Sequence, residues 1–80
     1  MNLTDRQWDI LVMVAAYIEE HGYPPSMRDI CEFCGVFSTS VAAYNLNILE
    51  NKGLIYRERH ISRAIAVTPT GKALLAEARA

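Results

Sequence analysis

Three glycines divide most of this 80-residue sequence into short amphipathic segments. Gly22, Gly35 and Gly53 each follow a run whose apolar residues recur every three or four positions, the spacing of one face of an α-helix. Glycine readily takes the left-handed backbone conformation that ends a helix, so each of these positions predicts a helix terminus. The pattern therefore favours three helices of unequal length before residue 54.

The first two of these segments begin with capping boxes. Thr4 is followed three residues later by Gln7, and Ser26 by Asp29, a spacing that lets each side chain bond the other residue's backbone N–H. Between them, Tyr23-Pro24-Pro25 cannot continue a helix, because proline lacks an N–H and restricts the residue before it. We therefore expect helices over about residues 4–21 and 27–34, joined by a stiff extended connection.

The stretch from Ser38 to Gly53 predicts the third helix, over about residues 39–52. Ser38, Thr39 or Ser40 can cap its first turn. At 100° per residue, one side of this helix is apolar and the other is polar. The apolar side holds Ala42, Leu46 and Leu49, and the opposite row holds Ser40, Tyr44, Asn47 and Asn51. The polar row offers hydroxyl, phenol and carboxamide groups that can donate to and accept from DNA bases or phosphates.

After residue 53 the pattern changes from helical to extended. Two runs of strand-forming residues, at 54–59 and 64–68, flank a polar tip and predict a β-hairpin over about residues 54–68. Thr68-Pro69 then places a cap before a proline at the first helical position, which predicts a last helix over about residues 69–78. The fold class expected for this single domain of residues 1–80 is mainly α with a small β-hairpin, a winged helix-turn-helix in which the hairpin is the wing.

Charge is unevenly distributed along the chain. The net charge of −1 taken alone argues against a nucleic-acid binder, because phosphate contacts normally need an excess of Lys and Arg. Residues 1–51, however, hold two Lys and Arg against seven Asp and Glu, a net charge of −5, whereas residues 52–80 hold six against two, a net charge of +4. The positive charge of residues 52–80 is concentrated at the wing, and this asymmetry points to an anionic partner for that part of the chain.

Several classes of protein are disfavoured. No apolar run approaches the ~20 residues of a membrane span and the start is unlike a signal peptide, so we expect a cytoplasmic protein that does not contact a membrane. Cys31 and Cys34 have C-x-x-C spacing, but a structural zinc takes four ligands and only His21 and His60 remain. We interpret the thiols as reduced core residues and expect no metal and no cofactor. No set of nucleophile, base and orienting group indicates an enzyme.

The amino-acid sequence of residues 3 to about 67 resembles that of the DNA-binding domain of LexA repressors. The shared phrases are Leu3-Thr4-x-Arg6-Gln7, His21-Gly22-Tyr23-Pro24-Pro25-Ser26-x-Arg28-x-Ile30, Gly35-x-x-Ser38-Thr39-Ser40, Leu46-x-x-Leu49-Glu50-x-Lys52-Gly53-Leu54-Ile55 and Arg63-Ala64-Ile65. The resemblance implies a winged helix-turn-helix whose third helix enters the major groove of an operator, usually as a dimer on a palindrome. The self-cleaving peptidase domain of those repressors has no counterpart in these 80 residues, so self-cleavage is not implied. Residues 67–75 resemble instead the helix after the wing in compact regulators of the MarR type, where it often helps to form a dimer.

The candidate DNA-contacting residues follow from these patterns. For base reading we expect Ser38, Ser40, Val41, Ala43, Tyr44 and Asn47, and for phosphate binding Arg28, Thr39, Arg57, Arg59 and Arg63. Ser38 matches a base-contacting position of the family, whereas Ser40, Val41, Ala43 and Tyr44 differ from its residues, so the family's operator does not carry over. Competing interpretations stay open: Tyr44 packing on the wing beside solvated asparagines, and arginines paired with Glu58 or Glu50.

The sequence thus predicts a sequence-specific regulator of transcription, a repressor, that binds double-stranded DNA as a homodimer through the last helix or the wing. The alternative is a winged-helix module that binds another protein through Val41, Ala43 and Tyr44. A third hypothesis is a structural dimerisation unit that depends on Leu74 and Leu75.

Overall fold

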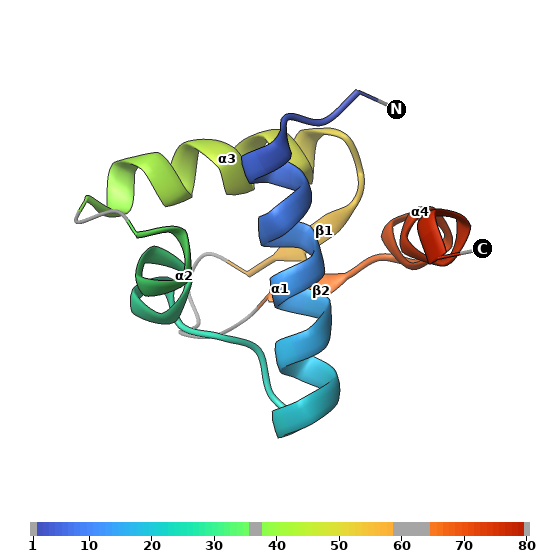
Figure 1. The fold of residues 1–80 in the computed structure, drawn as a ribbon, viewed down its shortest axis with the longest axis horizontal. Coiled ribbons are helices and arrows are strands. Elements are labelled where there is room, and N and C mark those ends of the chain that lie inside the picture. Colours follow the sequence, from blue (N-terminus) through green and yellow to red (C-terminus); the bar gives the residue numbers. More distant parts are fainter. Residues whose placement is uncertain (1, 36–37, 59–64, 80) are drawn as a thin grey trace.

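A computed structural model describes residues 2–35, 38–58 and 65–79. The described residues form four helices and two strands, in the order α1 (Asp5–His21), α2 (Met27–Cys34), α3 (Thr39–Asn51), β1 (Ile55–Arg57), β2 (Ile65–Val67) and α4 (Pro69–Arg79) (Figure 1). This arrangement confirms the expected fold class, a mainly helical winged helix-turn-helix.

The capping boxes of α1 and α2 form as their spacing predicts. The Gln7 N–H donates to Thr4 Oγ1 and the Thr4 N–H donates to Gln7 Oε1, both at 3.1 Å. The Asp29 N–H donates to Ser26 Oγ at 3.1 Å, and the Ser26 N–H donates to Asp29 Oδ2 at 2.9 Å. Local sequence signals alone therefore fix where both helices begin.

The left-handed ends expected after the first three helices are also present. Gly22, Gly35 and Gly53 have φ angles of 78°, 70° and 75°. At the second of these, the Gly35 N–H donates back to carbonyls of the last turn of α2. The chain can then reverse direction between α2 and α3, which brings the two helices into the angled packing of a helix-turn-helix.

The core lies where α1, α2 and α3 meet the base of the hairpin. Its buried apolar side chains are Ile10, Leu11, Val14, Ile30, Cys31, Ala42, Leu46, Leu49, Leu54, Ile55 and Leu75. Cys31 is only 7% exposed, and Cys34 is partly buried against the same cluster, as expected for thiols that serve as core residues. Leu3 packs on the core as well.

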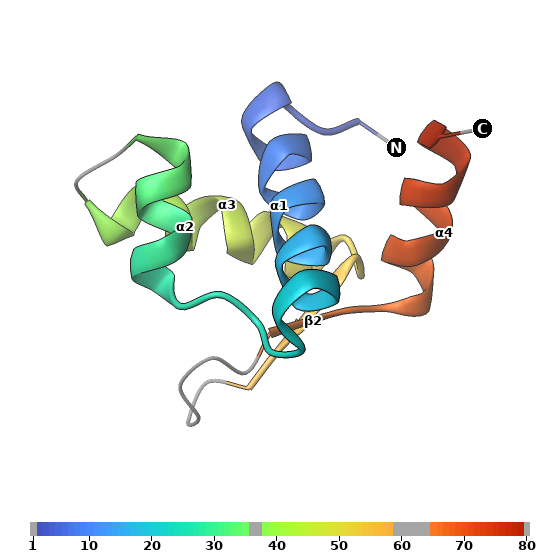
Figure 2. The same ribbon diagram turned by 60° about the horizontal axis from the view of Figure 1, so that its bottom comes forward.

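The two strands pair antiparallel, with Ile55 opposite Val67 and Arg57 opposite Ile65. Leu54 and Ile55 are buried, so the hairpin is anchored to the core at its base. Figure 2 shows β2 leading from the hairpin into α4, which lies on the other side of α1 from α2. Among the described residues, no helix is long and apolar enough to cross a membrane.

A single hydroxyl fixes the start of α4. Thr68 Oγ1 accepts a hydrogen bond from the Gly71 N–H at 3.0 Å and donates one to the Gly53 carbonyl oxygen at 2.6 Å. The Thr68 N–H donates to the Leu54 carbonyl oxygen at 3.1 Å. Thr68 is therefore the cap that the Thr-Pro pair predicts, and it also ties α4 to the turn that follows α3.

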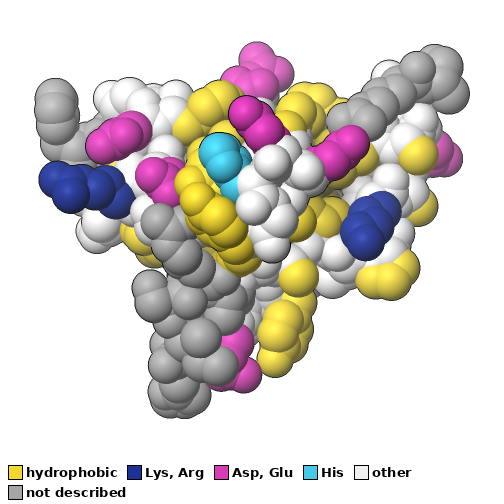
Figure 3. Space-filling model, turned by 90° about the horizontal axis from the view of Figure 1, so that it is seen from below, with side chains coloured by type: hydrophobic (Ala, Val, Ile, Leu, Met, Phe, Trp, Pro, Cys, Tyr) yellow, Lys and Arg dark blue, Asp and Glu magenta, His cyan; other side chains and the backbone are white. Residues whose placement is uncertain are grey.

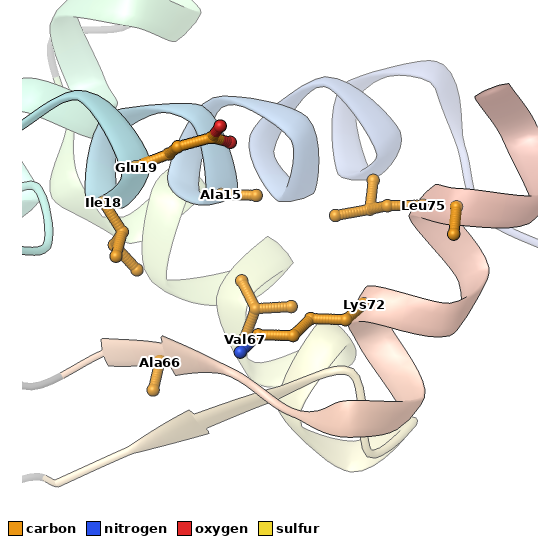
Figure 4. Close-up of a pocket in the computed structure, with 8 residues that line it drawn as sticks. Ala15, Ile18, Glu19, Ala66, Val67, Lys72 and Leu75 are labelled. Atoms are coloured by element: carbon orange, nitrogen blue, oxygen red, sulfur yellow. The ribbon is translucent and has the colours of Figure 1, made fainter.

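An open groove of about 420 Å³ separates α1 from α4 above β2. It is lined by Ala15, Ile18, Glu19, Ala66, Val67, Lys72, Leu75 and Ala76. In Figure 4 the side chain of Lys72 runs from α4 towards Val67, while the Glu19 carboxylate lies on the wall formed by α1. The groove is mainly apolar, with one charge of each sign on opposite walls.

We expect Gly71→Ala to destabilise the domain although alanine is normally the better helix residue. A Cβ at this position would collide with the Leu54 carbonyl and lie 2.8 Å from Val67 Cγ1. The free energy of unfolding, measured by urea titration, should fall by about 1–3 kcal/mol, as for other overpacked sites. Thr70→Ala, at the exposed neighbouring position, is the control and should change it by less than about 0.5 kcal/mol. A neutral Gly71→Ala variant would show that α4 is not seated against Leu54.

Candidate nucleic-acid interface

The outer row of α3 is open to solvent. Tyr44 is 66% exposed and Val41 37%, and Ser40 and Asn47 are exposed too, whereas Ala43 is half-buried. Ala42, Leu46 and Leu49 on the opposite side are fully buried. The helix therefore turns the expected apolar face to the core, and the residues predicted to read bases lie on its accessible side.

The N-terminal end of α3 is capped by Ser38, one of the three candidates. Ser38 Oγ accepts a hydrogen bond from the Ser40 N–H at 3.1 Å, which leaves the hydroxyl hydrogen of Ser38 to donate elsewhere. Thr39 is the first helical residue and is exposed, and no acidic residue lies in the first turn. The unpaired N–H groups and the helix dipole at this end favour an anion such as a phosphate.

A buried pair of amides that the sequence analysis did not single out holds α3 against α1. Gln7 and Asn45 are only 5% and 6% exposed, and Gln7 Nε2 donates to Asn45 Oδ1 at 3.3 Å. Asn45 Nδ2 in turn donates to the Val41 carbonyl oxygen at 2.9 Å. A signal did exist, because position 45 falls within the buried stripe of α3, three residues after Ala42 and one before Leu46.

The base of the wing lies beside the outer row of α3. Arg57 Nη1 donates to Asn47 Oδ1 at 2.9 Å, which joins a residue predicted to bind phosphate to one predicted to read bases. Tyr56, on the other side of the strand, is 57% exposed, and its hydroxyl donates to Glu58 at 3.4 Å. The outer row of α3 and the described base of the wing thus adjoin each other. Arg59 and Arg63, the other wing arginines predicted to bind phosphate, lie outside the described residues.

Arg28 lies in the first turn of α2, and its partner is not one that the sequence analysis considered. Its Nε is 3.9 Å from Glu32 Oε1, and the two side chains are 88% and 73% exposed. An ion pair this long between such exposed groups contributes little to stability, because water screens it. Arg28 therefore remains accessible to an anionic ligand.

The end of the molecule where α1 finishes has the opposite character. Figure 3 shows this face, with acidic side chains lying around the histidine. His21 stacks there with Tyr17, ring centroids 4.1 Å apart, and with Tyr23 at 5.6 Å. A phosphate backbone would be repelled by this acidic group of side chains.

The surroundings of Cys34 disfavour its thiolate form. Burial raises the pKa of the Cys34 thiol above its ordinary value, although the nearby Arg6 guanidinium opposes this shift. The thiol therefore stays protonated and unreactive at neutral pH. Within the ranges that the structure describes, no three His, Cys, Asp or Glu side chains gather as metal ligands would.

Comparison with known proteins connects this geometry to a family. Residues 1–64 match the family model described as the LexA DNA binding domain, a regulatory rather than a catalytic unit. The chain is 51% identical over 65 residues to the LexA repressor of Roseiflexus sp. (strain RS-1), covering 81% of this chain and 30% of that protein. It is 43% identical over 72 residues to the LexA repressor of Ligilactobacillus salivarius (strain UCC118), covering 90% and 35%. The chain spans about a third of the length of these relatives.

We expect alanine substitutions at two asparagines of α3 to have opposite consequences. Asn45→Ala removes the acceptor of the buried Gln7 amide, so the free energy of unfolding should fall by about 1–3 kcal/mol. Asn47→Ala removes an exposed side chain, so it should change that free energy by less than about 0.5 kcal/mol. Thermal and urea unfolding followed by circular dichroism measure both. Equal losses would mean that the buried amide pair does not hold α3 in place.

Proposed function

The chain belongs to the LexA DNA-binding domain family, and from this premise we propose that it is a transcriptional repressor that reads a specific sequence in double-stranded DNA. The observation that carries the proposal is the exposed row of α3, which continues into the wing through the Arg57–Asn47 hydrogen bond. The 13-residue length of α3 and its polar outer row suit a helix that lies in the major groove.

The division of labour that we propose follows the two kinds of group on this surface. Tyr44 and Asn47, with Ser38 and Ser40, offer hydrogen bonds to base edges, while Val41 and Ala43 can contact thymine methyl groups. Phosphates would be held by Thr39 at the N-terminus of α3, by Arg28 and by the wing arginines 57, 59 and 63. Since α3 itself carries no Lys or Arg, most of the affinity would come from these flanking groups.

A second function is favoured by one observation. Tyr44 and Val41 expose apolar surface beside each other on α3, as a helix that docks on another protein does. In that case the wing would be incidental. The same variants separate the two functions, because a protein-binding module would bind DNA weakly and without regard to the outer row of α3.

We expect a random duplex library to yield an enriched palindrome whose affinity falls steeply with salt concentration, because phosphate contacts release counterions. Tyr44→Ala and Asn47→Ala should each weaken binding to that duplex by about 1–3 kcal/mol, measured by fluorescence anisotropy. Val12→Ala is the matched control, since Val12 is exposed on α1, outside the proposed DNA surface, and should leave affinity unchanged. Unselective binding that ignores both substitutions would contradict the proposal.

We also propose that the protein acts in the cytoplasm as a homodimer formed through α4. In support, the groove beside α4 is mainly apolar and carries Glu19 and Lys72 on opposite walls. A two-fold interface is reciprocal, so a contact between Glu19 of one copy and Lys72 of the other would form twice. Two copies would then present two reading helices to a palindrome.

We expect Ala76→Glu to abolish this dimer, because it places a charged carboxylate in the mainly apolar groove, where the interface would strip it of water. Ala78→Glu is the matched control: Ala78 is exposed on the same helix but about 200° around its axis from Ala76, and dimerisation should survive. Sedimentation velocity at micromolar concentration measures both. A dimer that persists in the Ala76→Glu variant would point to the wing instead, and a monomeric parent protein would rule the interface out.

A further inference from the structure

The hydrogen bond between Arg57 and Asn47 fixes which way the Asn47 carboxamide faces. A guanidinium group carries N–H donors and no acceptor, so the atom 2.9 Å from Arg57 Nη1 must be the amide oxygen. The amide nitrogen lies on the other side of the same planar group. Asn47 Nδ2, a donor with two hydrogens, is therefore the amide atom that does not bind Arg57.

This orientation changes what Asn47 can read. A free asparagine pairs with adenine through two bonds, its oxygen accepting from N6 and its nitrogen donating to N7. Here one lone pair of the oxygen is already used by Arg57, and the positive guanidinium beside the oxygen opposes the approach of another donor such as the adenine amino group. The groups of the pair that are best placed to bind a base electrostatically are then donors, namely Asn47 Nδ2 and the remaining N–H groups of Arg57.

Of the two purines, guanine is the one whose major-groove edge presents only acceptors, namely N7 and O6. We propose that Arg57 is a positioning residue that makes Asn47 a reader of guanine rather than adenine. The inference rests on the proposed DNA-binding function and deepens it, because it assigns a base to one position of the site. The pair spans α3 and β1, so the base preference of the helix depends on a residue of the wing.

The hydrogen bond is well placed for such a role. Asn47 is exposed and lies three residues, about one helical turn, after Tyr44 on the outer row. Arg57 lies in β1, whose neighbour Ile55 is 2% exposed, so the strand that carries the guanidinium is anchored in the core. A rigid strand holds the donor in place, and ordering Arg57 costs less than it would in a mobile loop.

The test compares base preferences in four versions of the full 80-residue chain: the parent, Asn47→Ala, Arg57→Met and the double variant. Each is selected against a random duplex library, and affinities for the winning duplex and its single-base substitutions are measured by anisotropy. The position that loses its preference in Asn47→Ala is the one that Asn47 reads. In the parent it should be guanine, favoured over adenine by about 5- to 150-fold.

Arg57→Met keeps an unbranched apolar stem but cannot donate. It should shift this one position towards adenine and leave the other positions unchanged, and it should cause no further change in preference once Asn47 is alanine. Asn47→Asp supplies a second line of support: it keeps an acceptor for Arg57 but has no donor, so guanine should be lost and cytosine, whose N4 amino group donates, should gain. Unchanged melting temperatures exclude loss of folding as the cause.

The results separate this inference from the function on which it rests. If the parent protein selects no sequence from the library, both the proposed function and this inference are overturned. A selected sequence in which Arg57→Met lowers affinity equally for every base makes Arg57 a phosphate ligand only and overturns the inference alone. A parent preference for adenine at the Asn47 position does the same.

Discussion

The position of α3 depends on a hydrogen bond that is buried beneath it. Gln7 uses its oxygen to cap α1 and its nitrogen to hold Asn45, so one side chain sets both the start of the first helix and the seat of the third. In an otherwise apolar contact, an amide pair is satisfied in only one register, because any slip leaves a buried donor or acceptor without a partner. Apolar packing supplies the attraction between α1 and α3, and the amide pair specifies how they align.

Local signals made much of this architecture predictable. Capping boxes, prolines and glycines act over three or four residues, so Thr4, Ser26 and Gly35 mark their helix ends whatever the rest of the chain does. The two faces of α3 could be assigned for the same reason, since helical periodicity alone separates Leu46 from Tyr44. The sequence resemblance to the LexA family then connected these elements to a function that no single segment indicates.

The contacts that shape the candidate site were not predictable in this way. Asn45 joins Gln7 across 38 residues and Asn47 joins Arg57 across a turn and a strand, so both depend on how elements pack. Helical periodicity can separate the buried Asn45 from the exposed Asn47, but it does not show which partner either amide meets. Arg28 is a similar case, because its partner Glu32 lies one turn along the same helix rather than at the glutamates that sequence reasoning proposed.

Thr68 connects the last helix to the end of α3, the helix that we propose faces DNA. Its hydroxyl joins the turn that closes α3 to the first turn of α4, and the Gly53 carbonyl and the Gly71 N–H are both held by this one oxygen. The end of α3 and the start of α4 are therefore held together through the side chain of Thr68. If a second copy binds along α4, this connection would set the angle between the two α3 helices of the dimer. That angle would in turn set the spacing of half-sites that the dimer accepts. Spacing, in such a protein, would be encoded outside the helix that reads the bases.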